Sequence, residues 1–185
     1  MKSQGSKGFT LLDTMIVVSI MATFAVMALP SFTSNDTYQL DLAKNEIVAA
    51  IRFARSEALR TGETYGVDIN RASKQITIYK ADLTVIPVGQ EFIAYHPINK
   101  NPYDYNLNTD FNLINVSIVN STEPFLFTDS VRRKSLLFDA NGTPVWFDSN
   151  TGTTYQLNNG VVELAKGVHT YNVSVQPYNG RVTSQ

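Results

Sequence analysis

An apolar segment near the N-terminus, with one carboxylate close to its start, most constrains what this chain can fold into. The run Met15–Leu29 contains no charged residue, and Asp13 lies just before it. As an α-helix, the stretch from Phe9 to Pro30 measures roughly 33 Å, enough to span the hydrocarbon core of a bilayer. A charged side chain in hydrocarbon is costly even on the mildest insertion scales. Asp13 therefore needs a cationic partner, and the nearest candidate is the amine that cleavage between Gly8 and Phe9 creates.

Two simpler interpretations compete for the same segment. A secretory signal peptide would use Lys2 and Lys7 as its basic region and be cleaved after Ala28, releasing a soluble β-domain enzyme or lectin. A plain transmembrane anchor would remain uncleaved. Neither interpretation explains the acid at position 13 or the glycine that precedes Phe9.

Helical periodicity continues after Pro30, although the hydrophobicity falls. Small and aliphatic residues recur at intervals of three and four, while the opposite face carries polar and charged residues such as Arg52 and Arg55. Arg60 and Gly62 are typical of a helix C-terminus. The pattern predicts one long helix from about Phe9 to Thr61, bent at Pro30. Its predicted buried positions are Leu40, Ala43, Ile47, Ala50, Ile51, Ala54 and Ala58.

The remainder of the chain is predicted to be β-structure. Alternating apolar and polar residues indicate strands with one buried face, and Asn-Gly and Thr-Gly pairs mark turns between them. Cysteine is absent, so packing alone must stabilise this region. The predicted strands are Thr64–Asn70, Lys74–Lys80, Thr84–Val88, Glu91–His96, Leu113–Val119, Phe125–Phe127, Ser135–Asp139, Val145–Asp148, Thr154–Leu157, Val161–Ala165 and Thr170–Gln176.

Two parts of the sequence carry a resemblance to a known family. Gly8-Phe9-Thr10-Leu11-Leu12, followed by an acid and an apolar run, resembles the cleavage and methylation signature of type IV prepilins and type II secretion pseudopilins. The stretch from Ile51 to Gly62, with the strand after it, is similar to the GspH/FimT group of minor pilins. The resemblance implies that a prepilin peptidase cleaves between Gly8 and Phe9 and N-methylates Phe9. It also implies that Phe9, Asp13 and Pro30 act in filament assembly, although the family's acid is usually Glu, one methylene longer than Asp13.

The resemblance further implies a fold and a role. The expected fold is α+β, with a long N-terminal helix, its first half transmembrane, packed on an antiparallel β-sheet or β-sandwich globular domain. The expected parts are a leader (1–8), a transmembrane and filament-core helix (9–30), an amphipathic continuation (31–62) and a globular domain (63–185). The protein is then a non-enzymatic minor pilin or pseudopilin, without cofactor or metal. The protein is first expected to be anchored in the bacterial inner membrane with its globular domain in the periplasm. It is then expected to join other pilins through their N-terminal helices, priming or capping a pilus or pseudopilus.

A DNA-binding minor pilin acting in DNA uptake is the alternative function. The cluster Arg132, Arg133 and Lys134 offers enough charge for a few phosphate contacts. Some FimT-like proteins bind DNA through a Gly-Arg-x-Arg motif near the C-terminus, where this chain keeps Arg181 and lacks the second arginine. The formal net charge of −1 gives no overall attraction to nucleic acid.

Three other features have ordinary interpretations. His96 and His169 lie in separate β segments without a catalytic partner at motif spacing, and Asp139-x-Asn141-Gly142 indicates a hairpin turn rather than a calcium loop. The stretch Pro97–Asn112, rich in asparagine and tyrosine, is predicted to be a solvated insertion, with partner contact as the alternative.

Overall fold

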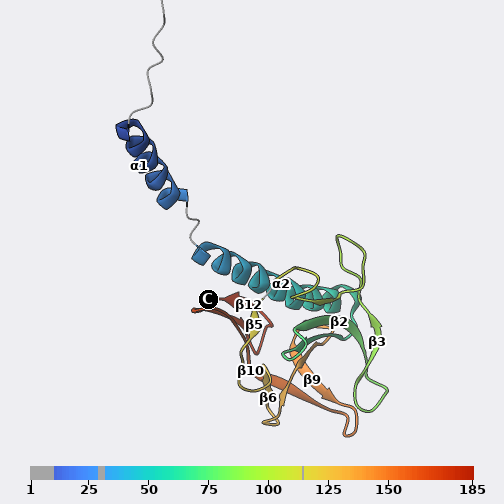
Figure 1. The fold of residues 1–185 in the computed structure, drawn as a ribbon. Helices are drawn as coiled ribbons and strands as arrows, with labels where there is room; N and C mark the ends of the chain where they lie inside the picture. The colour runs from blue at the N-terminus through green and yellow to red at the C-terminus, as the bar shows by residue number, and fades with distance from the viewer. Residues whose placement is uncertain (1–10, 29–31, 114) are drawn as a thin grey trace, which may run out of the picture. The chain divides into compact units, whose positions relative to one another are not determined.

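The computed structural model describes residues 11–28, 32–113 and 115–185, and these residues fall into two compact units (Figure 1). The first unit ends at Asn35 and contains α1 (Leu11–Ala28); the second runs from Asp36 to Gln185. Among the described residues, no helix has both the length and the apolar character needed to cross a membrane. The expected membrane segment, residues 9–30, includes positions at each end that lie outside the described ones.

The second helix, α2 (Phe32–Thr61), follows the periodicity of its sequence closely. All seven of the residues predicted to be buried, from Leu40 to Ala58, have no exposed surface. The helix ends as its sequence indicates, because Gly62 adopts a φ of 72° and its N–H donates to the carbonyl of Ala58 at 2.9 Å. The structure contains two helical segments where the sequence predicts one bent helix. Pro30, the predicted site of the bend, lies outside the described residues.

Twelve strands form one continuous sheet in which every neighbouring pair is antiparallel. The main path runs β12-β11-β10-β9-β8-β1-β2-β3, while β4 adds to β2, β5 and β6 add to β10, and β7 adds to β6. The strands are β1 (Tyr65–Asn70), β2 (Gln75–Asp82), β3 (Gly89–Ile93), β4 (Asp104–Asn106), β5 (Ser117–Ile118), β6 (Phe125–Phe127), β7 (Arg132–Arg133), β8 (Ser135–Phe138), β9 (Pro144–Asp148), β10 (Thr153–Lys166), β11 (His169–Val175) and β12 (Val182–Ser184).

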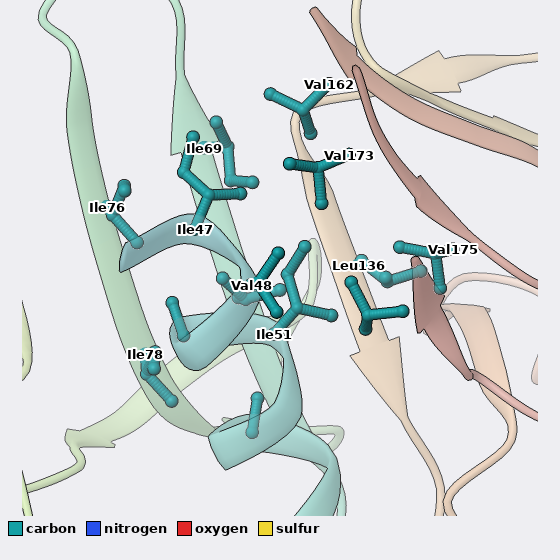
Figure 2. Close-up of a cluster of buried hydrophobic side chains, with 14 of the residues drawn as sticks. Ile47, Val48, Ile51, Ile69, Ile76, Ile78, Leu136, Val162, Val173 and Val175 are labelled. Carbon is teal, nitrogen blue, oxygen red and sulfur yellow. The ribbon is translucent and has the colours of Figure 1, made fainter. Parts of the chain in front are cut away.

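The core lies between α2 and the curved sheet. Figure 2 shows side chains of α2, including Ile47 and Ile51, with Ile78 of β2 on one side and Val173 of β11 on the other. The alanines of α2 allow this approach because a methyl group keeps the helix backbone close to its neighbours. The predicted α+β fold, a helix packed on an antiparallel sheet, is confirmed.

Two predicted features of the β region are wrong. The Asn-Gly pair at 159–160 does not form a turn, because β10 is a single strand that continues through it. Thr84–Val88 is a turn rather than a strand, and the carboxylate of Asp82 accepts hydrogen bonds from the backbone N–H (2.9 Å) and hydroxyl (2.6 Å) of Thr84.

The stretch Pro97–Asn112 is also not the solvated insertion that its composition predicts. It contains β4, which pairs with β2, and it buries Tyr103 and Leu107 completely or nearly so. The ring of Tyr103 stacks on Phe53 of α2, with their centroids 5.3 Å apart. This segment therefore forms part of the core that covers α2.

Candidate functional site

The N-terminal residues expected to act in assembly divide into those that the structure describes and those that it does not. Gly8, Phe9 and Pro30 lie outside the described residues. Asp13 lies in the first turn of α1 and is exposed, a position at which the helix dipole favours a negative charge. The pairing predicted for Asp13 with the amine of Phe9 in another subunit is not tested here and stays a prediction.

The surface of α1 is apolar, and its hydroxyl groups are satisfied within the helix. Among the exposed side chains are Leu12, Met15, Ile16 and Phe24. The hydroxyls of Thr14, Ser19 and Thr23 donate to backbone carbonyls three or four residues earlier, at 2.7 to 2.8 Å. Hydroxyls bonded in this way can enter an apolar environment at little cost. Asp13 is the only ionisable side chain in the described helix.

The basic cluster at 132–134 is largely neutralised by its neighbours. Arg133 forms a two-pronged ion pair with Asp129 (2.6 and 3.1 Å), which lowers the pKa of Asp129, and its guanidinium lies 4.9 Å from the ring centre of Trp146. Lys134 pairs with Asp68 at 2.9 Å. Of these three residues, Arg132 alone forms no ion pair with a described acidic residue, and it donates to the carbonyl of Glu123 at 3.0 Å. These contacts argue against a phosphate-binding patch at the cluster.

Arg181 lies apart from that cluster, in a groove of about 430 Å³ between α2 and the C-terminal strand. Two arginines of α2 line the same groove and each binds a backbone carbonyl. Arg52 donates through Nη2 to the carbonyl of Val182 at 3.1 Å, and Arg55 donates through Nε to that of Gly142, also at 3.1 Å. The groove therefore gathers three cationic side chains from two distant parts of the sequence.

Gly180 allows the chain to enter this groove. Its φ of 62° lies in the left-handed region, and a Cβ there would be 2.9 Å from Cε1 of Phe138, 3.0 Å from the carbonyl oxygen of Gly142 and 3.1 Å from Cδ of Arg55. Only glycine fits both the dihedral angle and the space. The backbone before β12 can consequently pass close to the β8–β9 hairpin and to α2.

The turn that connects β8 to β9 in this hairpin is the one predicted from Asp139-x-Asn141-Gly142. A carboxylate oxygen of Asp139 accepts the backbone N–H groups of Asn141 (2.9 Å) and Thr143 (2.8 Å), and Gly142 adopts a φ of 69°. The two N–H donors and the carboxylate oxygen that accepts them are bonded to one another within the turn, as in an ordinary Asx turn. Among the described residues, no group of three or more histidine or carboxylate side chains is arranged to hold a metal ion.

A second set of polar side chains lies where α2 meets the segment 97–112. The hydroxyl of Tyr105 donates to Oε2 of Glu46 at 3.5 Å, and the ring of His96 lies 4.9 Å from that of Tyr103. Burial raises the pKa of Glu46, whereas the hydrogen bond from Tyr105 and the charge of His96 act to lower it. These groups pack among aromatic rings, and the hydrogen bond from Tyr105 to Glu46 joins β4 to α2. The histidine at 96 thus takes part in packing.

The sequence interpretation did not identify Arg52 and Arg55 as parts of a site. The sequence places both on the polar face of α2, and their spacing of three residues is the available signal that they share that face. Their position beside Arg181 depends on the pairing of β12 with β11, which brings residues more than a hundred positions apart together. Periodicity within one helix cannot report such a contact.

Comparison with known proteins places most of the chain in one family. The model of the family described as type II transport protein GspH matches residues 43–177. A search of solved structures finds the crystal structure of the type IV minor pilin FimU of Pseudomonas aeruginosa, with 15% sequence identity and a TM-score of 0.42, covering 82% of this chain and 92% of that one. No curated protein matches.

Proposed function

The chain belongs to the GspH family of type II transport proteins, and on this premise we propose that it is a non-enzymatic minor pilin or pseudopilin. In this proposal it is one of the subunits that prime or cap a type IV pilus or a type II secretion pseudopilus. The observation that carries the proposal is the family match over residues 43–177, which covers most of α2 and the sheet as far as β11.

The properties of α1 support a role in assembly. Its described residues expose aliphatic and aromatic side chains, and its hydroxyls are bonded internally. We propose that residues 9–30 hold the protein in the bacterial inner membrane, with the β domain in the periplasm, before they pack against the equivalent helices of other subunits. Such packing relies on close van der Waals contact, because lipid and helix surfaces are equally apolar.

Asp13 has a specific role in the proposed assembly. Cleavage after Gly8 by a prepilin peptidase gives Phe9 a new amine, which is then methylated and keeps its positive charge. The carboxylate of Asp13 accepts that amine from a neighbouring subunit and sets the axial register. In a medium of low dielectric constant, an ion pair of this kind is strong and an unpaired member is costly. The simpler role for Asp13 is to complement the dipole of its own helix.

The packing of α2 supports the proposal that this helix and the sheet form one rigid domain. The buried stripe from Leu40 to Ala58 fixes the helix against the sheet over most of its length. Near its start, the buried ammonium of Lys166 donates to the side-chain oxygen of Gln39 and lies 3.3 Å from a carboxylate oxygen of Asp36. From Asp36 onward, α2 and the sheet therefore form one compact unit.

The mass of the mature N-terminus tests the proposal. Native protein recovered from its host membranes should begin at Phe9 and carry one additional methyl group, and it should be recovered together with other pilin-like subunits. Intact mass spectrometry and N-terminal sequencing give both results. A chain that begins after Ala28, or that keeps its first eight residues, would rule out processing as a prepilin.

A further inference from the structure

The C-terminal strand β12 forms one free edge of the sheet. Among the described strands, the order ends at β12, which pairs with β11 alone. Asn172 and Gln185 exchange both of their backbone hydrogen bonds, and the N–H of Gln176 donates to the carbonyl of Arg181. Because bonded and non-bonded pairs alternate in antiparallel strands, the backbone groups of Val182 and Ser184 point away from β11. The hydrogen bond from Arg52 to the carbonyl of Val182 agrees with this direction.

These outward groups face the groove that was described around Arg181. One wall is α2 and the other is the edge of β12, so an extended chain lying in the groove meets the backbone N–H groups of Val182 and Ser184 and the carbonyl of Ser184, while the carbonyl of Val182 already accepts from Arg52. The residues that line it are Arg52, Arg55, Ser56, Leu59, Gly180, Arg181, Val182, Thr183 and Ser184.

The groove is cationic. It contains three arginines and no acidic residue, and none of the salt bridges found among the described residues involves any of these arginines. Arg52 and Arg55 each use one N–H on a backbone carbonyl, which fixes their guanidinium groups and leaves other donors of the fork available. A fixed guanidinium loses little freedom when it binds a carboxylate through two parallel hydrogen bonds.

We propose that this groove binds an extended acidic segment of another polypeptide, which adds to the edge of β12 as a further strand. Its backbone pairs with Val182 and Ser184, and its carboxylates bind the guanidinium groups of Arg52, Arg55 and Arg181. Main-chain bonds to a sheet edge give affinity in this mode of recognition, and side-chain contacts give specificity. The inference goes beyond the proposed role as a filament subunit and does not depend on cleavage after Gly8.

The geometry favours a peptide over a nucleic acid as the occupant. Val182 and Ser184 present backbone N–H groups two residues apart along a strand, and Ser184 also presents its carbonyl. This is the alternating pattern that another extended backbone matches. A phosphate chain accepts hydrogen bonds but donates none, so it would leave the carbonyl of Ser184 without a partner. Nucleic acid is accordingly the competing outcome of the experiment.

The test is a fluorescence anisotropy titration of the full chain in a mild detergent, with a labelled short peptide in which glutamate alternates with valine. A peptide with glutamine in place of glutamate tests the charge, and an unlabelled single-stranded oligonucleotide tests competition. Arg181→Gln and Arg52→Gln remove one guanidinium each, and Ser184→Pro removes an edge N–H. Arg132→Gln is the matched control, an exposed arginine outside the groove that also binds a backbone carbonyl.

We expect each groove arginine variant to weaken binding of the acidic peptide by about tenfold, the change that one charge-assisted contact typically makes. The control should change it less than about twofold. Bound peptide should also slow amide hydrogen exchange at Val182 and Ser184 in the unmutated protein, a measurement that does not depend on how any variant folds. Equal affinity for the two peptides, unchanged exchange at both amides, or displacement of the peptide by the oligonucleotide at lower concentration would each overturn the proposal.

Discussion

Replacing Ile51 by alanine tests whether the buried face of α2 holds the β domain together. Ile51 has no exposed surface and lies in the core cluster between the two sides of the sheet (Figure 2). The substitution removes about three carbon atoms, worth about 2.4 kcal/mol of transfer free energy at ~0.8 kcal/mol each. A residual cavity adds to this loss, and the better helix propensity of alanine returns about 0.4 kcal/mol. The expected loss of unfolding free energy is about 3 kcal/mol.

Leu59→Ala provides the matched control on the same helix. Leu59 is 50% exposed, so the same number of carbon atoms is removed from a site that is already half in water. No closed cavity forms there, and the expected loss is about 1 kcal/mol. For a chain of this size, the difference corresponds to midpoints of thermal unfolding separated by roughly 4 to 8 °C.

Guanidinium chloride unfolding of the full chain in detergent measures both losses. The fluorescence of Trp146, the sole tryptophan, reports the transition. The denaturant dependence of the unfolding free energy should be the same in all three proteins, which shows that stability alone has changed. Equal losses for the two variants, or a loss below about 1 kcal/mol for Ile51→Ala, would refute the reasoning from burial.

The remaining predictions concern assembly, a glycine and one titrating side chain. Asp13→Ala should reduce incorporation into filaments severalfold while leaving cleavage after Gly8 intact, as measured by immunoblotting sheared filaments and sequencing the mature N-terminus. Gly180→Ala should lower the unfolding free energy by about 2 to 3 kcal/mol, because it combines a left-handed φ with contacts near 3 Å. Gly152→Ala, at a φ of 66° in open space, should cost only about 1 kcal/mol. Glu46→Gln should stabilise the protein more at pH 7 than at pH 5.

The pH dependence follows from the direction of the shift at Glu46. Burial raises the pKa of this carboxyl group, so the folded state binds its proton more tightly than the unfolded state does. Its contribution to stability is therefore present at low pH and is lost as the pH rises through the raised pKa. Glutamine resembles the protonated form at every pH, which is why its advantage grows toward neutrality. A difference between variant and unmutated protein that is the same at both pH values contradicts this assignment.

Controls separate the other two predictions from general damage. Asp13→Glu keeps the charge and restores the longer acid, so it should assemble at least as well as the unmutated chain. Normal filament incorporation of Asp13→Ala would remove the pairing role. Equal losses for the two glycine variants would mean that the dihedral angle, and not the space around Gly180, determines the cost.

The helical part of the fold could be predicted from the sequence because its signals are local. The buried stripe of α2 is set by a spacing of three and four residues, and its end is set by Gly62 two positions after Arg60. The hairpin turn at Asp139 is equally local, since the hydrogen bonds that Asp139 makes with Asn141, Gly142 and Thr143 join residues no more than four positions apart. For such local features the competing conformations are few, and the local sequence favours one of them.

The predictions that failed depend on distant partners. Asn159-Gly160 has the composition of a turn, yet a Cβ at Gly160 would lie 3.1 Å from Leu157 and 3.3 Å from both Phe125 and Val175. The glycine therefore serves close packing where β10 meets β6 and β11, with a register shift between Leu157 and Asn159. Pairing with two other strands outweighs a local turn preference. The burial of Tyr103 against α2 has the same origin.

Only part of the candidate site could be predicted from the sequence. Arg181 was identified through a motif, but its neighbours Arg52 and Arg55 come from α2. The basic cluster at 132–134 was identified through charge alone, and its acidic partners Asp129 and Asp68 were not foreseen. Asp68 comes from β1, whereas Asp129 lies in the turn four residues before Arg133, so a count of basic residues alone overestimates the charge that this surface presents.

The burial of α2 along its length has a mechanical consequence. A force that draws the helix lengthwise out of the sheet acts on all the contacts between Leu40 and Ala58 at the same time, so the side chains resist together in shear. Strands at the open edges of the sheet can instead be peeled away one pair of hydrogen bonds after another. Tension applied along the helix should therefore meet more resistance than the peeling of an edge strand does.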